Sequence, residues 1–191
     1  SLKEGERLQG RVTLFLFIFE SQVIYVMRNP KDTLVSFYYF HNMVKCLDTP
    51  KDFQDFLEKF INGQVFIGSW FEHVRGWQEN NHPNMLWLTY EEMKKDLPAV
   101  VWKICKFVGK HLTEEQVLEV VKHSSFKAMK ANPSVNKEDL DSVFDLTKGK
   151  FMRKGKVGDW KNHFTVAQNE CLFGDFWFIL NKKMAAEPPG R

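Results

Sequence analysis

The spacing of hydrophobic residues along the chain predicts buried strands that alternate with amphipathic helices. Residues 23–27 and 84–89 form short, nearly continuous apolar runs, which are typical of strands buried on both faces. Apolar residues at helical spacing predict further helices over 30–44, 50–62, 70–78 and 98–108, and one that begins at Thr113. This order predicts an α/β fold, a parallel sheet flanked by helices, in which ligands bind at the carboxyl ends of the strands.

A basic segment near the end of the chain stands out against this pattern. Residues 148–161 contain three glycines, the aromatics Phe151 and Trp160, a single acid, Asp159, and six cationic side chains: Lys148, Lys150, Arg153, Lys154, Lys156 and Lys161. Forked arginine and point-charge lysine contacts on a glycine-rich loop suit a compact polyanion. A solvated surface loop is the alternative, since clusters of charged residues usually lie on the solvent-exposed surface. The two aromatic residues argue against this alternative, because a loop that is only exposed to solvent gains nothing from large apolar side chains.

The sequence FMRKGKVGDWKNHFT at 151–165 resembles the co-substrate loop of the cytosolic sulfotransferases. In that family the loop wraps the 3′-phosphate and the adenosine of 3′-phosphoadenosine 5′-phosphosulfate (PAPS). The resemblance implies a P-loop-kinase-like sulfotransferase fold and a set of nucleotide-binding residues: Arg28, Ser36, Tyr90, Ser124, Ser125, Phe126, Phe151, Met152, Arg153, Lys154 and Gly155.

Several of these residues have simpler explanations. Arg28 at the tip of the first strand could pair with Asp32, and Ser36 could be an ordinary serine on a helix face. Tyr90 could cover the sheet. Residues 124–126 could form a turn. The local sequence leaves these alternatives open, and the resemblance favours the nucleotide.

The resemblance begins abruptly along the chain. Residues 1–22 do not match the family pattern, 23–184 correspond to the C-terminal portion of a sulfotransferase domain, and 185–191 form a tail. Within the first segment, 12–19 is an apolar run too short to span a bilayer and is interpreted as a buried strand. The family's Pro-Lys-Ser-Gly-Thr loop and its catalytic histidine, which bind and transfer the 5′-phosphosulfate, have no counterpart here. We therefore expect a fold incomplete at its N-terminus, assign no catalytic residue, and expect weak or absent activity from this chain alone.

The resemblance also implies the reaction and the partners. A sulfuryl group would pass from PAPS, without a metal, to a hydroxyl or amine of a small molecule such as a phenol, alcohol or amine. Lys161, Thr165, Val166 and Glu170 match the family's homodimer motif, although Thr165 and Gln168 also form a capping box. A cytoplasmic location is expected. The three widely spaced cysteines fit free thiols in a reducing compartment.

Other functional classes share some of these sequence features. A non-catalytic nucleotide-binding or dimerising module remains an alternative. An RNA-binding domain would use the same basic and aromatic segment, but a net charge of +3 without a basic stripe argues against nucleic acid. A membrane surface would likewise need a broad basic face. A nucleotide kinase is disfavoured because no GxxxxGK[ST] motif is present.

Overall fold

The structure, a computed structural model, describes residues 21–80, 82–136 and 140–170. The apolar run at 12–19, Cys171 and the tail at 185–191 lie outside these residues. The two expected strands are present: β1 (Val23–Met27) and β2 (Met85–Thr89) pair in parallel, in a register from Val23 opposite Met85 to Met27 opposite Thr89. The carboxyl ends of both strands therefore meet at one edge of the sheet, which places Arg28 and Tyr90 side by side.

The expectation that β1 is buried on both faces is wrong for the described residues. Ile24 and Val26 are 40% and 49% exposed, whereas Tyr25 between them packs against Trp77 of α4 and Trp87 of β2. Side chains alternate along a strand. The neighbouring elements therefore cover the face of β1 that carries Tyr25 and leave Ile24 and Val26, on the opposite face, partly exposed.

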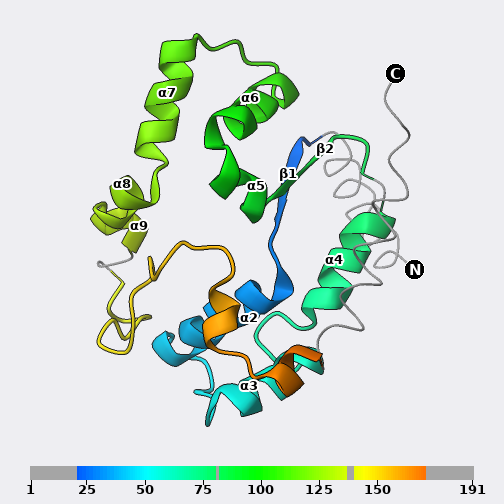
Figure 1. The fold of residues 1–191 in the computed structure, drawn as a ribbon, viewed down its shortest axis with the longest axis vertical. Coiled ribbons are helices and arrows are strands. Elements are labelled where there is room, and N and C mark those ends of the chain that lie inside the picture. Colours follow the sequence, from blue (N-terminus) through cyan, green and yellow to red (C-terminus); the bar gives the residue numbers. More distant parts are fainter. Residues whose placement is uncertain (1–20, 81, 137–139, 171–191) are drawn as a thin grey trace, which may run out of the picture.

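Helices surround this pair of strands (Figure 1). In chain order they are α2 (Pro30–Met43), α3 (Phe53–Ile61), α4 (Trp70–Glu79), α5 (Tyr90–Lys95), α6 (Leu97–Phe107), α7 (Glu114–His123), α8 (Phe126–Lys130), α9 (Pro133–Asn136) and the 3-10 turn η1 (Asp159–Asn162). Across the described stretches, none of the helices has the length and apolar character needed to cross a membrane.

The predicted helices are confirmed to within a few residues, with three differences. The helix expected from residue 50 begins instead at Phe53, because its N-cap is Asp52, whose side chain accepts a 2.8 Å hydrogen bond from the Asp55 amide. The short helix α5 was not expected, although Thr89 caps it by accepting from the Glu92 amide at 3.1 Å. The four-residue α9 was not expected either. Helices this short bury too few apolar residues to show a helical period.

The described chain has two hydrophobic clusters at opposite ends of the molecule (Figure 1). One lies between α2 and α3 and contains Leu34, Phe56, Leu57 and Phe60. The other lies between α6 and α7 and contains Val101, Cys105 and Val117. The strands run between the two ends, and the basic segment returns beside α2. The sheet edge is therefore the place where both ends and the basic segment come together.

Candidate functional site

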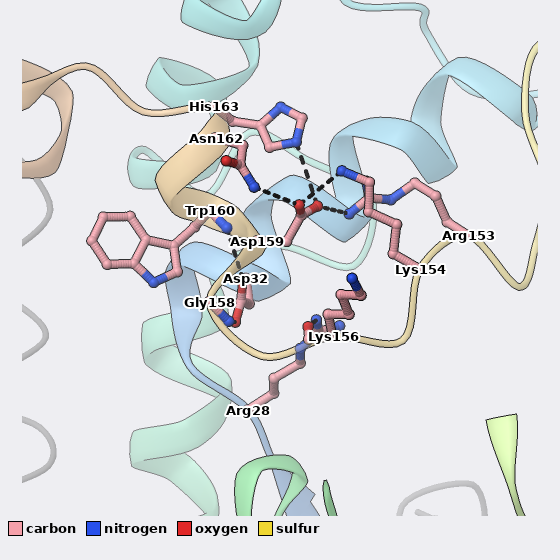
Figure 2. Close-up of polar contacts among 10 residues, drawn as sticks. All are labelled: Arg28, Asp32, Arg153, Lys154, Lys156, Gly158, Asp159, Trp160, Asn162 and His163. Carbon is pink, nitrogen blue, oxygen red and sulfur yellow. Dashed lines mark hydrogen bonds and ion pairs between the residues drawn. The ribbon is translucent and has the colours of Figure 1, made fainter.

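Asp32 in the first turn of α2 attaches the basic segment to that helix (Figure 2). Its carboxylate accepts hydrogen bonds from the backbone amides of Gly158 at 2.6 Å and Trp160 at 2.9 Å, across 126 and 128 residues of sequence. The side chain is 1% exposed. Asp32 therefore binds the backbone of the basic segment and not Arg28, the partner that the local sequence suggested, because backbone amides occupy both carboxylate oxygens. The segment is held where α2 begins, beside the sheet edge.

A second buried carboxylate, Asp159, organises the cations of the segment (Figure 2). Its Oδ2 receives Nη2 of Arg153 at 2.6 Å, and its Oδ1 receives Nζ of Lys154 at 2.8 Å and Nδ2 of Asn162 at 3.1 Å. Burial alone would raise the pKa of Asp159, but the hydrogen bonds from Lys154, Arg153 and Asn162 outweigh it and hold the pKa far below its usual range. Asp159 therefore carries a permanent negative charge.

Arg28 projects from the tip of β1 toward the same segment (Figure 2). Its Nη2 donates to the backbone oxygen of Lys156 at 3.1 Å, and its guanidinium lies 4.3 Å above the ring of Tyr90. Its Nε is buried and has no hydrogen-bond partner in the described residues. Buried donors are normally paired, so an unpaired donor on a cationic side chain here indicates a place for an anionic ligand.

Tyr90 supplies the other strand tip. Burial raises the pKa of its phenol above the ordinary value, although the neighbouring Arg28 acts in the opposite direction. The phenol therefore stays protonated. It presents an aromatic face to Arg28 and keeps an O–H that can donate.

Two cavities flank Arg28. The larger, of about 890 Å³, is lined by polar residues that include Arg28 and Ser36, by Tyr90, and by many further aromatic residues: Tyr25, Phe37, Phe40, Phe60, Phe66 and Trp70. The second, of about 610 Å³, is lined by two apolar side chains, a glycine and several charged residues: Phe126, Val157, Gly155, Glu91, Lys94, Lys95, Lys154 and Lys156. Because Arg28 lines the first and bonds to Lys156 of the second, its guanidinium lies where the two cavities approach each other.

The turn at Gly155 packs directly against Phe126 of α8. Gly155 has φ +60°, and a Cβ at this position would overlap the Phe126 ring. Both the backbone conformation and the space therefore require glycine. The ammonium groups of Lys94 and Lys130 lie 5.9 Å and 6.0 Å from the centre of the same ring. The result is an aromatic surface in a cationic environment next to a backbone turn.

Seven of the residues expected from the sequence fall into two neighbouring groups. Arg28, Ser36 and Tyr90 line the larger cavity, Phe126, Lys154 and Gly155 line the second, and Arg153 is joined to Lys154 through Asp159. Three of the other four have local structural roles here. Ser124 ends α7, and Ser125 caps α8 by accepting from the Ala128 amide at 3.2 Å. Phe151 packs edge-on against Phe144 at 5.9 Å, and Met152 is half-buried.

Sequence reasoning missed the roles of Asp32 and Asp159. The available signal was weak: Asp159 is the single acid among six cations, and Asp32 follows Arg28 closely. Tyr39 was missed as well, although its ring supports the Arg153 guanidinium at 4.4 Å. In the parts of the chain that are described, no group of three or more His, Cys, Asp or Glu side chains is placed to hold a metal ion.

The fold and the site define an α/β protein whose parallel sheet, flanked by helices, ends in a cationic, aromatic binding edge. The model of the family described as "Sulfotransferase domain" matches residues 16–184. The chain belongs to the sulfotransferase family. It is 48% identical to bovine sulfotransferase 1E1 over 151 residues, which cover 78% of this chain and 51% of the relative. It is also 48% identical to mouse sulfotransferase 2B1 over 162 residues, covering 84% and 48% of the two chains.

Solved structures agree with this assignment. A retinol dehydratase in complex with androsterone and the inactive cofactor PAP has a TM-score of 0.74 at 31% identity and covers 89% of this chain and 49% of its own. A mouse sulfotransferase complexed with PAP has a TM-score of 0.70 at 35% identity and covers 87% and 59%. The chain spans about half the length of the curated relatives named above.

Proposed function

We propose that this chain supplies the 3′-phosphoadenosine half of a PAPS-dependent sulfotransferase site, which passes a sulfuryl group to a hydroxyl or amine of a small molecule. The observation that carries the proposal is the position of Arg28. Its guanidinium lies between two cavities with a buried, unpaired Nε, and it bonds to the backbone beside the Gly155 turn.

The chemistry around Arg28 supports a phosphate ester on an aromatic base. Arg28, Arg153 and Lys154 provide forked and point-charge contacts for a phosphate, and the exposed Ser36 on α2 can donate a hydroxyl beside Arg28. The rings of Tyr90 and Phe126 offer faces on which a purine can stack. PAP, adenosine 3′,5′-bisphosphate, combines these two features, and two of the similar solved structures named above hold it.

The larger cavity suits the acceptor. Its volume of about 890 Å³ and its many aromatic lining residues favour a small apolar molecule with one polar end directed at Arg28 and Ser36. We propose a phenol, an alcohol or an amine as the acceptor class. The similar retinol dehydratase structures hold androsterone or retinol together with PAP.

We propose that the 191-residue polypeptide binds PAP but transfers sulfate weakly or not at all. Sulfuryl transfer, like phosphoryl transfer, requires in-line placement of the reactants and stabilisation of charge on the leaving oxygen. The sequence contains no Pro-Lys-Ser-Gly-Thr loop for the 5′-phosphosulfate, and we assign no histidine as the base. No metal is required in this proposal.

The proposal is tested by calorimetric titration with PAP and with adenosine 5′-monophosphate (AMP), which lacks the 3′-phosphate. We expect PAP to bind more tightly. We expect Arg28→Gln to weaken PAP by about tenfold or more, because a charge-assisted contact is lost. Arg75→Gln is the matched control, since Arg75 lies on α4 and its side chain is 58% exposed. Absence of PAP binding, or equal affinity for PAP and AMP, contradicts the proposal. Robust sulfate transfer to a panel of phenols contradicts its second part.

A homodimer belongs to the same proposal. Val166, at the centre of the motif formed by Lys161, Thr165, Val166 and Glu170, is 76% exposed, which suits a contact with a second copy. The capping box is also present, because Thr165 and Gln168 exchange hydrogen bonds of 2.9 Å and 3.2 Å. Capping explains Thr165 but not an exposed valine. Val166→Glu is expected to shift the chain toward monomer in sedimentation velocity, and an unchanged profile contradicts a dimer through this motif.

A non-catalytic nucleotide-binding module is the second candidate function, and the unpaired Nε of Arg28 favours it equally. PAP binding without turnover, measured on the longest natural chain that contains these residues, would select it. With either function we propose a cytoplasmic location. The free thiols of Cys46 and Cys105 suit a reducing compartment.

A further inference from the structure

We propose that Asp159 is a positioning residue that sets the preference for nucleotides carrying a 3′-phosphate. Its carboxylate holds Arg153 and Lys154 in the orientation in which they contact that phosphate. The inference rests on the proposed function and adds to it a residue that does not itself touch the ligand.

The Asp159 carboxylate is buried, and both of its oxygens accept hydrogen bonds. Its side chain is 5% exposed, and Arg153, Lys154 and Asn162 donate to its two oxygens within 3.1 Å (Figure 2). His163 lies 3.5 Å from Oδ2. A phosphate that took the place of this carboxylate would have to break all of these contacts. Asp159 is therefore better suited to fix the cations than to occupy their site until a ligand arrives.

Asp159 leaves hydrogen-bond donors available on both Arg153 and Lys154. A guanidinium carries five N–H donors and an ammonium three. Asp159 engages Nη2 of Arg153 and Nζ of Lys154. The side chains of Arg153 and Lys154 remain 21% and 44% exposed, so both still reach solvent and can meet a ligand.

The negative charge of Asp159 also offsets repulsion among the cations of the proposed site. Arg28, Arg153 and Lys154 would repel one another if they were gathered at one phosphate without a counter-charge. Lysine also has a long flexible stem and loses rotamer freedom when it is fixed. Asp159 offsets the repulsion and orients the Lys154 stem before the ligand binds. The ring of Tyr39 supports Arg153 from the other side at 4.4 Å.

The position of Asp159 is itself fixed by α2. Its two chain neighbours, Gly158 and Trp160, donate their amides to Asp32 at 2.6 Å and 2.9 Å. The helix that carries Ser36 thus also sets where the Asp159 carboxylate lies. Ser36 is therefore linked to α2 directly, and Arg153 and Lys154 are linked to it through Asp159.

The test compares PAP with AMP on Asp159→Asn, which keeps the shape of the side chain and removes its charge. We expect PAP affinity to fall by about tenfold or more, as for the loss of one charge-assisted contact, while AMP affinity changes by less than about twofold. The PAP-to-AMP ratio is the decisive quantity, because a general loss of structure lowers both affinities together. Asp55→Asn is the matched control, since Asp55 forms a 2.8 Å ion pair with Lys59 on α3.

Three results overturn the inference. An unchanged PAP-to-AMP ratio, with both affinities retained or both lowered, reduces Asp159 to a structural residue. Tighter PAP binding by Asp159→Asn makes it a competitor of the phosphate. Failure of the unsubstituted chain to prefer PAP removes the proposed function itself, and this failure is visible before any variant is made.

A second variant keeps the inference testable if Asp159→Asn does not fold. Asn162→Ala removes the neutral donor to the same Oδ1 that Lys154 contacts, and it leaves every charge in place. We expect the PAP-to-AMP ratio to fall by about twofold to fivefold, within the range of one neutral hydrogen bond. An unchanged ratio in this variant overturns the inference as well.

Discussion

The absence of a single methyl group at position 155 allows the basic turn to meet the Phe126 ring. Gly155 adopts φ +60°, where a Cβ is unfavourable, and the ring occupies the space that a Cβ would need. The contact brings residues of the second cavity together. A substitution at Gly155 therefore has two separable costs in folding free energy, one from the left-handed backbone and one from overlap with the Phe126 ring.

We expect Gly155→Ala to destabilise the fold and to lower PAP affinity. The left-handed backbone alone costs an alanine about 1–2 kcal/mol, and overlap with Phe126 adds to this. Gly109→Ala is the matched control, because Gly109 has φ +67° and open space around it. Urea unfolding should show a larger loss for Gly155→Ala than for the control, and only Gly155→Ala should weaken PAP in calorimetry. Equal losses in both variants would show that the ring contact has no energetic role.

His41 in α2 predicts a pH dependence of stability. It is 6% exposed and packs edge-on against Phe37 at 4.7 Å, and its Nε2 has no hydrogen-bond partner in the described residues. Burial lowers the pKa of His41 below its ordinary value of 6.5, although interactions with Asp48 raise it in part. The unfolded chain therefore takes up this proton at a higher pH than the folded chain does. The stabilising contribution is complete above the unfolded pKa and is lost as pH falls through the folded pKa.

We expect the urea midpoint of the unsubstituted chain to fall between pH 7 and pH 5, and His41→Phe to reduce this fall. Phenylalanine keeps the aromatic packing with Phe37 and cannot be protonated. Some dependence should persist, because burial also lowers the pKa of His163. His123→Gln is the control, since the His123 side chain is 72% exposed on α7. An identical slope for His41→Phe and the unsubstituted chain would contradict the argument.

At the scale of elements, Asp32 joins α2 to η1, and this junction places the basic segment at the sheet edge. A carboxylate accepts from two amides at once, whereas an asparagine amide offers one oxygen and turns its NH₂ toward the second donor. The junction therefore depends on the charge and on the double acceptor of a single side chain.

Asp32→Asn is expected to lower the free energy of unfolding by about 1.5–3 kcal/mol, the range for a lost hydrogen bond to a charged group. Asp96→Asn is the matched control. Asp96 caps α6 by accepting one bond from the Ala99 amide at 3.0 Å, a position where asparagine serves nearly as well. Chemical denaturation followed by tryptophan fluorescence measures both. Similar small losses in the two variants would show that the Asp32 junction contributes little.

The limits of sequence reasoning also appear at the scale of elements. The strand at 23–27 and the helix Pro30–Met43 were predictable because a continuous apolar run and a proline start are local signals. The short α5 and α9 carry no such period. The hydrogen bonds from Gly158 and Trp160 to Asp32 connect residues more than a hundred positions apart, and no local pattern encodes them. Arg28 and Lys154 were found through resemblance, while the acid that orients Lys154 was noted only as an exception in the charge pattern.

At the scale of the whole molecule, the candidate site connects two separately packed ends. One cluster lies between α2 and α3 and the other between α6 and α7 (Figure 1). Two contacts connect these ends. Arg28 lies over the ring of Tyr90 in α5, and Gly155 of the basic segment packs on Phe126 in α8. The basic segment belongs to the α2–α3 end, whereas α5 and α8 adjoin the α6–α7 end. A nucleotide held at these contacts touches both ends at once.

Hydrogen exchange should reveal this arrangement. We expect PAP to slow amide exchange at 155–158, at the start of α5 and in α8, because ligand contacts restrict local opening there. The α3 helix contributes none of the residues proposed to contact the nucleotide, so it serves as the internal reference and should change less. Uniform protection of the whole chain would instead indicate a general effect on global unfolding, and protection confined to α3 would contradict the position of the site.

The packing of Phe126 on Gly155 has a consequence for how long such a polypeptide survives. A molecule that clamps both ends raises the free energy of unfolding by mass action, by about 2.7 kcal/mol when its concentration is a hundred times its dissociation constant. Degradation follows the population of opened chains. The abundance of this protein should then rise and fall with the supply of sulfate donor and its spent product, whether or not a single acceptor is ever turned over.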